Sequence, residues 1–387
     1  MASIFNKSIM KKVVNPFNTV GYISEKYFCD RITELNRLLQ NARNGVNTTL
    51  ISGRKYGKSA LIYRFFEELN KEKEWICIYF DIYSTQNLKE FTELLAAKVM
   101  QKFPQKESMG KRFWNYLKTL RPVMTYDALS GQPEVHFEFS QPKDYEKTLT
   151  SILQFLDEQK IPVLLAIDEF QQVALYPEKN TEAVLRTIIQ TLHNVQFIFS
   201  GSNQHLMLEI FSSAKRPFFS STQSMSLSEI PPDIYKDFIF IHFAENKKEI
   251  TNETVEFILD WTFNHTYYTQ FLCNNLFASG SRKPDIPLTK SVCAEILEAE
   301  QANFLQYRNL LTSFQWRLLI AIAKEEKLYQ PQSKQFIQKY KLGAASTVKK
   351  AIDSLIDKEM VFVHIEKNES YYRIYDVFLM RWLQRTY

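Results

Sequence analysis

Cysteine is scarce in this sequence, and its four copies lack the spacing that gives cysteine a chemical role. They stand singly among apolar residues, with no C-x-x-C pair. This argues against a zinc site, a disulfide framework and redox catalysis, and it favours a reducing compartment, the cytoplasm. No apolar run reaches the roughly 18 residues of a membrane-spanning helix, and lysines interrupt the first 18 residues. The sequence therefore predicts neither a membrane span nor a signal peptide.

Glycine and proline, at 9 and 13 of 387 residues, are too few for a collagen-like or a disordered chain. Hydrophobic residues make up 45% of the chain and charged residues 24%, which is an ordinary globular balance. A prior of roughly one domain per 150 residues predicts two or three domains, each able to bury a core.

Neither sign of charge dominates, because the net charge is only +5. The excess is local: residues 311–387 hold 13 Lys and Arg against 8 Asp and Glu, whereas the rest of the chain is balanced. A local positive excess favours polyanions such as nucleic acid. A solvated, lysine-rich surface explains the same numbers, so both interpretations stay open.

Residues 47–228 alternate short apolar runs with amphipathic helices, which predicts an α/β fold with a parallel sheet covered on both faces. The helix expected at 58–70, for example, places Leu61, Phe65 and Leu69 on one face. Five apolar runs are expected to be strands: 48–52, 75–83, 162–168, 195–201 and 223–227.

The chain is expected to have four parts. Helical periodicity runs from 231 to 307, and three helices and a two-stranded hairpin after residue 311 are typical of a winged helix-turn-helix. The parts are an N-terminal segment and helix (1–46), the α/β domain (47–228) with an inserted hairpin at about 120–140, a helical lid domain (229–310) and the winged helix (311–387).

A phosphate-binding loop is expected where the first strand meets the next helix. Backbone N–H groups of such a loop and the helix dipole favour anionic oxygens, while Lys58 would reach the β- and γ-phosphates and Ser59 would bind Mg²⁺. The pattern G-x-x-x-x-G-K-[ST] departs at its first position, where Ser52 replaces glycine. The residues expected at the nucleotide are Ser52, Gly53, Arg54, Lys55, Tyr56, Gly57, Lys58, Ser59 and Ala60.

Two carboxylates, Asp168 and Glu169, end the apolar run that begins at Pro162. In an open α/β sheet ligands bind outside the carboxyl ends of the strands. Asp168 is therefore placed to hold Mg²⁺ through a bound water, and Glu169 to polarise the attacking water. A strand that simply ends in a polar loop is the alternative.

A further strand ends in small polar residues, Ser-Gly-Ser-Asn at 200–203. Ser202 or Asn203 is placed to touch the γ-phosphate or the water, as a sensor of the bound nucleotide. Ordinary turn chemistry explains the same residues.

Together these motifs resemble the archaeal-type P-loop ATPase domains, which are similar to AAA-type ATPases and to the STAND ATPases. The resemblance covers nearly the whole chain, including the winged helix. It rests on five segments: Phe28-Cys-Asp-Arg-Ile-Thr-Glu-Leu35, Ser52 to Ser59, Asp168-Glu169, Phe199-Ser-Gly-Ser202 and the C-terminal segment Tyr375-Asp-Val-Phe-Leu-Met-Arg-Trp382.

The resemblance implies the strand order 5-1-4-3-2, with the five strands numbered along the chain, and Glu169 as the water-activating base. It also implies ATP and Mg²⁺ as cofactors and an adenine pocket lined by Tyr27, Phe28 and Arg31. A helix start with an aromatic staple accounts for these three residues equally well.

Two positions depart from what the family implies. Asn264-His-Thr266 stands where related ATPases have a G-x-P element that touches the nucleotide. The nearest candidates for an arginine finger, which acts on a neighbour's γ-phosphate in an oligomer, are Lys215 and Arg216, and a solvated loop position is the alternative for Arg216.

The winged helix offers a candidate DNA-reading helix at 345–358. Its expected solvent face carries Ser346, Thr347, Lys349 and Lys350, whereas Val348, Ile352 and Leu355 are expected inside. Asp353, Asp357 and Glu359 dilute this positive face, and a lid or protein-docking role stays open. Tyr371, Tyr372 and Tyr375 are expected in the core of the wing.

The function expected from these features is that of a cytoplasmic, Mg²⁺-dependent ATPase that binds ATP and ADP. One hypothesis is that hydrolysis drives a conformational change on double-stranded DNA. The other is a STAND-like nucleotide switch or protein-interaction scaffold with little turnover and no DNA binding, which acts on a protein partner or as a homo-oligomer.

Overall fold

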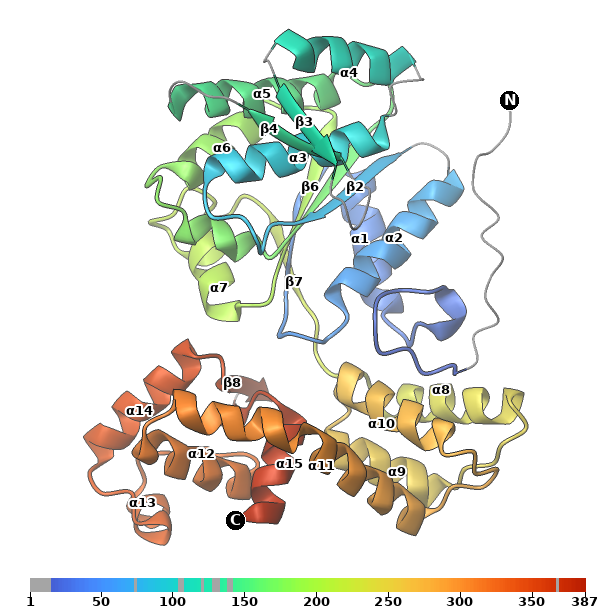
Figure 1. The fold of residues 1–387 in the computed structure, drawn as a ribbon, viewed down its shortest axis with the longest axis vertical. Coiled ribbons are helices and arrows are strands. Elements are labelled where there is room, and N and C mark those ends of the chain that lie inside the picture. The colour runs from blue at the N-terminus through green and yellow to red at the C-terminus, as the bar shows by residue number, and fades with distance from the viewer. Residues whose placement is uncertain are drawn as a thin grey trace. The chain divides into compact units, whose positions relative to one another are not determined.

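The computed structural model describes residues 15–72, 75–103, 108–119, 122–126, 133–137, 142–366 and 369–387. The chain divides into two compact units (Figure 1). One is Val20–Ser228, and the other is Glu229–Tyr387 together with the residues that precede Val20. Within the described ranges, every helix is too short or too polar to cross a bilayer.

The unit Val20–Ser228 is built on a five-stranded parallel sheet with the order β2-β5-β6-β1-β7. Counted along the chain, this is the predicted order 5-1-4-3-2, which is thereby confirmed. The strands are β1 (Thr48–Ile51), β2 (Ile76–Asp81), β5 (Val163–Asp168), β6 (Val195–Gly201) and β7 (Gln223–Ser226). Because all five run in the same direction, the residues that follow them meet at one edge of the sheet.

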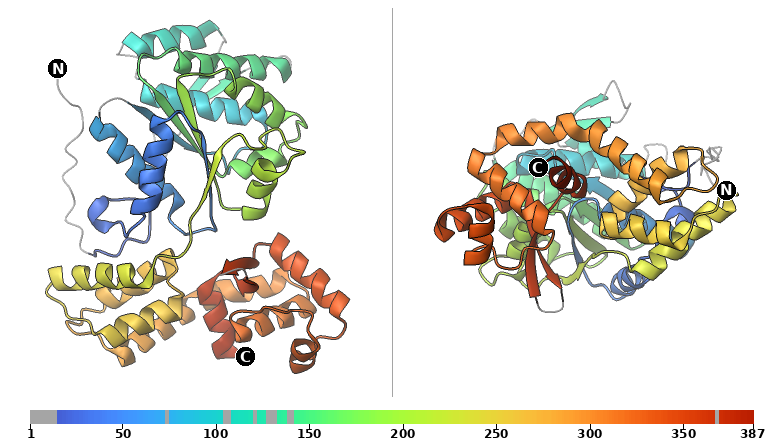
Figure 2. Two further views of the ribbon diagram at one scale, coloured as in Figure 1. Left: turned by 180° about the vertical axis from the view of Figure 1, so that it is seen from behind. Right: turned by 90° about the horizontal axis from the view of Figure 1, so that it is seen from below.

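Both faces of this sheet are covered, as Figures 1 and 2 show. Side chains alternate along a strand, so Leu164 and Ala166 of β5 join one apolar cluster, and Leu165 and Ile167 join the other. The first face packs against α1 (Ile32–Arg43) and α2 (Lys58–Glu72), and the second against α3 (Leu88–Lys102), α5 (Pro142–Asp157), α6 (Thr181–Ile189) and α7 (Gln204–Ser212).

Between α3 and α5 the chain contains a helix that the sequence pattern does not predict, α4 (Ser108–Thr119). It is followed by an antiparallel pair, β3 (Pro122–Tyr126) and β4 (Pro133–Phe137), at the place of the expected hairpin. The residues that connect β3 to β4, 127–132, lie outside the described ranges. The Phe137 backbone N–H donates to Glu93 of α3 at 2.7 Å, which fixes β4 to the outside of that helix.

The second unit begins with four helices and ends in a winged helix, as the fold prediction requires. Within it, the N-terminal Phe17 is fully buried and its ring contacts those of Phe243 and Phe277. The helices are α8 (Pro232–Glu245), α9 (Asn252–Thr262), α10 (Thr266–Ala278) and α11 (Ile286–Leu310). The winged helix comprises α12 (Ser313–Glu325), α13 (Lys334–Tyr340), α14 (Ala345–Asp357), β8 (Val361–Glu366), β9 (Glu369–Ile374) and α15 (Val377–Thr386).

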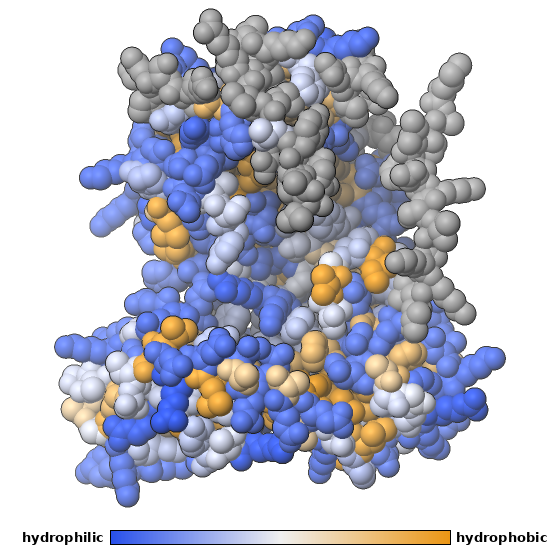
Figure 3. Space-filling view, viewed as in Figure 1, coloured by the Kyte–Doolittle hydropathy of each residue, from blue (hydrophilic) through white to orange (hydrophobic). Residues whose placement is uncertain are grey.

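The winged helix ends in a fourth helix, α15, where the sequence pattern predicts three. Its residue Trp382 is buried, and its ring contacts those of Trp316 on α12 and Phe304 on α11. Hydrophilic residues dominate the coloured surface in Figure 3, and apolar ones lie there in small groups. Single exposed apolar residues are normal for a globular protein.

Candidate functional site

The loop between β1 and α2 is closed around a buried lysine. The Lys58 ammonium donates to the backbone oxygens of Ser52 at 3.1 Å and Gly53 at 3.0 Å. Gly57 has a φ of +90°, a value that side-chain-bearing residues rarely adopt, so glycine is required there. Ser52 is fully buried and its hydroxyl donates to the Gly53 oxygen at 3.2 Å, so serine fits the first position of the motif.

Other residues of the loop differ in exposure. Arg54 and Lys55 are exposed, whereas Tyr56 is buried in the apolar cluster beneath α1 and α2. Ala60 lies half-buried in the first turn of α2.

Asp168, at the end of β5, is brought against the start of α2. Its side chain is 3% exposed, and its Oδ2 atom accepts hydrogen bonds from the Ser59 hydroxyl at 2.8 Å and the Tyr79 hydroxyl at 2.6 Å. Serine hydroxyl and aspartate carboxylate are the protein groups that hold Mg²⁺ in P-loop proteins. The two residues predicted for the metal therefore lie within hydrogen-bonding distance of each other.

Tyr79 was missed by sequence reasoning, because it stands on β2 and reaches Asp168 only through the pairing of β2 with β5. Burial and the nearby Asp168 carboxylate raise the pKa of Tyr79, so the phenol remains a hydrogen-bond donor. Its ring packs against Tyr63 of α2, with the two centroids 5.0 Å apart. Tyr79 thus helps to fix the orientation of Asp168, through the same carboxylate oxygen that Ser59 contacts.

Glu169 follows Asp168 in a left-handed backbone conformation, with φ at 56°. Its side chain is half-buried, and its Oε2 atom accepts a hydrogen bond from the Ser202 hydroxyl at 2.7 Å. The Gln171 amide donates to the same oxygen. Glu169 and Ser202 are therefore brought together, whereas Asn203 caps α7 by accepting from the Leu206 backbone N–H at 3.0 Å.

Gln171 is a second residue that sequence reasoning missed. It is 7% exposed, and a Cβ atom added to Gly201 would lie 2.4 Å from its Oε1 and 2.5 Å from the Met207 sulfur. Glycine at 201 is therefore required for this packing. The available signal was a pair of glutamines, Gln171 and Gln172, between apolar residues directly after Glu169.

A third carboxylate, Asp81, ends β2 in register with Asp168. Loss of hydration at this strand end raises the pKa of Asp81, and the neighbouring charges of Asp168 and Glu169 act in the same direction. Negative charge therefore gathers at the carboxyl edge of the sheet.

The predicted adenine-side residues lie in the leading segment, which we define as residues 20–31. The buried Arg31 guanidinium donates to the Ser228 backbone oxygen at 2.6 Å and to Glu34 at 3.0 Å, so Arg31 holds the segment beyond the carboxyl end of β7. Phe28 is half-buried against the cluster that contains Tyr56, and Tyr27 is half-buried.

The positions that depart from the family pattern have structural partners. Arg216 pairs with Glu182 at 2.9 Å and Glu209 at 2.7 Å, while Lys215 is exposed. His265 is buried and its Nδ1 accepts from the Tyr267 backbone N–H at 3.3 Å, which caps α10.

The fold and the site together are those of a P-loop ATPase. A glycine-containing loop joins a strand to the helix that begins with Lys58-Ser59. Asp168 and Glu169 lie at the end of another strand of the parallel sheet, whose order is 5-1-4-3-2. Residues 28–263 match the ATPase domain predominantly from Archaea, and residues 302–385 match a probable winged helix domain. The first match spans more than half of the chain. The chain therefore belongs to the family of ATPase domains predominantly from Archaea, which implies nucleotide binding.

Solved structures share the fold. A Walker-type ATPase of Pyrococcus abyssi is 16% identical, with 95% of this chain and 99% of that chain covered and a TM-score of 0.65. The ORC2 protein of Aeropyrum pernix, solved in complexes with ADPNP and ADP, is 14% identical, with 96% of each chain covered and a TM-score of 0.57. No curated protein sequence matches the chain.

Proposed function

We propose that the chain binds ATP together with Mg²⁺, hydrolyses it, and couples the nucleotide state to a conformational change. The observation that carries this proposal is the contact of Ser59 with Asp168 at 2.8 Å, at the start of the helix that also carries the buried Lys58. Gly57, with its φ of +90°, leaves the loop without a side chain at the position where its backbone turns toward the helix. These donors suit a triphosphate and its cation.

The residues have distinct roles in this proposal. Backbone N–H groups of residues 52–57 and the Lys58 ammonium would hold the phosphates, while Ser59 and Asp168 would hold the metal. Bound Mg²⁺-ATP supplies the phosphoanhydride to be cleaved and the cation that offsets its charge. Lys58 exchanges two neutral carbonyl partners for anionic oxygens, and hydrogen bonds between charged groups are the stronger ones.

Glu169 is the proposed general base. Its Oε2 atom accepts from Ser202 and Gln171, so these two residues set the direction in which the carboxylate points. If Ser202 turned toward a bound nucleotide, this oxygen would lose one of its two donors and would be better able to accept a proton from water. Ser202 would then report the presence of nucleotide to the base, the role of a sensor.

Phosphate release by the purified chain tests this function. ATP with Mg²⁺ is expected to bind and to be hydrolysed, and removal of Mg²⁺ by a chelator should stop hydrolysis. A chain that neither binds ATP nor releases phosphate would contradict the proposal.

A nucleotide switch with slow turnover is the second candidate function. It is favoured by the two hydrogen bonds that hold Oε2 of Glu169, because a base that is already engaged is a poor acceptor for the proton of water. Turnover stimulated by duplex DNA would support the first function. Slow turnover with nucleotide retained through purification would support the switch.

A substitution at Tyr79 tests the proposed metal site. Tyr79→Phe removes the hydrogen bond to Asp168 while it keeps the ring, so the Mg²⁺ concentration needed for half-maximal turnover is expected to rise about 10-fold, as for other groups that orient metal ligands. Tyr63→Phe is the matched control, because its ring packs on Tyr79. An unchanged Mg²⁺ dependence in Tyr79→Phe would remove the positioning role.

Duplex DNA is the proposed partner of α14. Ser346, Thr347, Lys349 and Lys350 are exposed, whereas Val348, Ile352 and Leu355 are buried, as the sequence pattern predicts. Tyr371 is buried in the wing, as expected, and Tyr372 and Tyr375 are half-buried. The acidic Asp353 and Asp357 are exposed toward the other end of the helix, so the positive charge lies in its first two turns.

The salt dependence of DNA binding tests this interface. Each lysine contact to a phosphate adds about 0.9 to the log–log slope of affinity against salt, so the double substitution of Lys349 and Lys350 by alanine is expected to lower the slope by nearly two. ATP affinity should be unchanged. Lys283→Ala, in the exposed loop between α10 and α11, is the control. Absence of duplex binding at low salt, with and without ATP, would favour the switch.

A further inference from the structure

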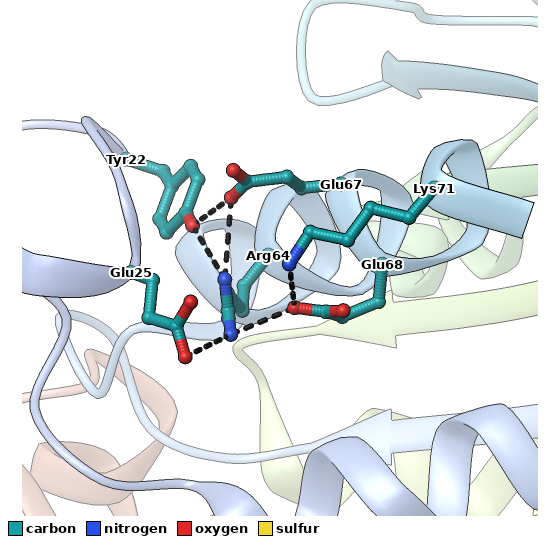
Figure 4. A network of polar contacts seen from close by, with 6 residues as sticks. All are labelled: Tyr22, Glu25, Arg64, Glu67, Glu68 and Lys71. Atoms are coloured by element: carbon teal, nitrogen blue, oxygen red, sulfur yellow. Dashed lines mark hydrogen bonds and ion pairs between the residues drawn. The ribbon is translucent and has the colours of Figure 1, made fainter.

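A buried arginine in the middle of α2 binds three carboxylates. Arg64 is 6% exposed, and its Nη2 atom lies 2.7 Å from a carboxylate oxygen of Glu25 and 2.7 Å from one of Glu68. Its Nη1 atom lies 3.4 Å from Glu67. Figure 4 shows the guanidinium between these groups, with Glu25 approaching from outside the helix.

The second tie between the same elements is made by Tyr22. Its hydroxyl donates to Glu67 and lies 3.5 Å from Nη1 of Arg64, as Figure 4 shows. The Tyr22 ring packs edge-on against Phe28, with centroids 5.7 Å apart. Tyr22 and Glu25 belong to the leading segment, whereas Arg64 and Glu67 belong to the helix that begins at the phosphate loop.

The leading segment has little regular structure of its own. One 3-10 turn, Glu25–Tyr27, is its only helix or strand before α1. Its two ends are held by arginines: Arg64 binds its first part to α2, and Arg31 binds its last part to the Ser228 oxygen beyond β7. The stretch between them therefore lies between α2 and the carboxyl edge of the sheet, where nucleotides bind in this fold class.

We propose that Arg64 is a positioning residue that holds the leading segment against α2 in the place where it forms the base side of the nucleotide site. This inference rests on the proposed function, since it takes ATP as the ligand. Arg64 thereby holds the leading segment, which would face the base, in a fixed position relative to α2, which carries Lys58 and Ser59.

The charges explain why arginine is required. Glu25, Glu67 and Glu68 would repel one another without a cation between them, and removal of one partner from a buried ionic cluster leaves the others uncompensated. The planar guanidinium serves several oxygens at once, which a lysine ammonium cannot do in the same geometry. In the absence of Arg64, Glu25 loses its ion pair with this position of α2, and the leading segment is expected to leave its place for part of the time.

A comparison of ATP with inorganic tripolyphosphate tests the inference. Arg64→Ala is expected to weaken ATP binding about 10-fold. This is the loss that follows if the leading segment is in place in only about one molecule in ten, because the apparent affinity falls with the fraction of competent molecules. Tripolyphosphate, which has no base, should bind with nearly unchanged affinity. Tyr22→Phe, which keeps the ring contact with Phe28 and loses only the hydroxyl bonds, should weaken ATP binding less, again without an effect on tripolyphosphate.

Lys71→Ala is the control, because Lys71 is largely exposed and its ion pair is with Glu68 of its own helix rather than with the leading segment. Its ATP affinity is expected to stay unchanged. Equal losses for ATP and tripolyphosphate in the Arg64 and Tyr22 variants, or no loss for either ligand, would overturn the inference.

The same measurements separate this inference from the proposed function. If the unsubstituted chain binds neither ligand, the proposed function fails. If it binds both ligands in a manner that depends on Lys58, the function stands and the ratio of the two affinities in Tyr22→Phe and Arg64→Ala decides the role of Arg64. Tyr22→Phe keeps the test available if Arg64→Ala does not fold.

Discussion

Replacement of Lys58 by alanine is expected to weaken ATP binding at least about 100-fold, because a hydrogen bond to a charged group contributes roughly 1.5–3 kcal/mol and the ammonium would serve two phosphates. The lysine is 6% exposed and already points into the loop, where it binds the backbone oxygens of Ser52 and Gly53. Equilibrium binding of a fluorescent ATP analogue measures the loss.

Lys55→Ala is the matched control for this substitution. Lys55 belongs to the same loop but is exposed, so the variant changes the charge of the loop without removing the buried ammonium. Its affinity should fall by much less. Unchanged nucleotide affinity in Lys58→Ala would end the assignment of this loop to phosphate binding.

The order of the sheet was implied by the family resemblance, whereas the two residue pairs of the site could be predicted because the members of each pair are close in sequence. Lys58 and Ser59 lie within one turn of helix, and Asp168 and Glu169 end a strand whose apolar run is unmistakable. That these pairs meet follows from the fold, since strands of a parallel sheet end at one edge. The Ser59 to Asp168 contact of 2.8 Å joins residues 109 positions apart and agrees with that expectation.

The partners that orient these residues could not be predicted. Tyr79 reaches Asp168 only because Tyr79 and Ala166 are paired in the register of β2 with β5, a detail that periodicity does not give. Arg64 looks like any surface arginine of an amphipathic helix until Tyr22 and Glu25 cover it. The burial of Phe17 among helices far along the chain, next to Phe243 and Phe277, likewise has no local signal.

Gln171 and Gly201 show how a short-range pattern can hide a packing requirement. Ser-Gly-Ser-Asn at 200–203 is consistent with an ordinary turn, yet Gly201 ends β6, without a positive φ. The glycine is needed instead because Gln171 and Met207 occupy the space of a Cβ atom. The close approach brings the Gln171 amide to Glu169, so the backbone of β6 takes part in orienting the proposed base.

Glu169→Gln is expected to leave ATP bound but to slow hydrolysis by about 10² to 10⁴-fold, the usual contribution of a general base. Glutamine keeps the size of the side chain, and its carbonyl oxygen can still accept the hydrogen bond from Ser202. The proton acceptor alone is lost. Phosphate release and ATP affinity, measured on the same preparation, separate the chemical step from binding.

Asp81→Asn shows whether slower hydrolysis in Glu169→Gln comes from the lost proton acceptor or only from the lost negative charge. Asp81 ends the neighbouring strand in register with Asp168, so its replacement removes one negative charge from the same edge of the sheet without touching the residue that follows Asp168. If the charge alone mattered, both variants would slow hydrolysis to a similar degree. A large loss in Glu169→Gln with a small one in Asp81→Asn assigns the effect to the proton acceptor, whereas turnover at the unsubstituted rate in Glu169→Gln excludes Glu169 as the base.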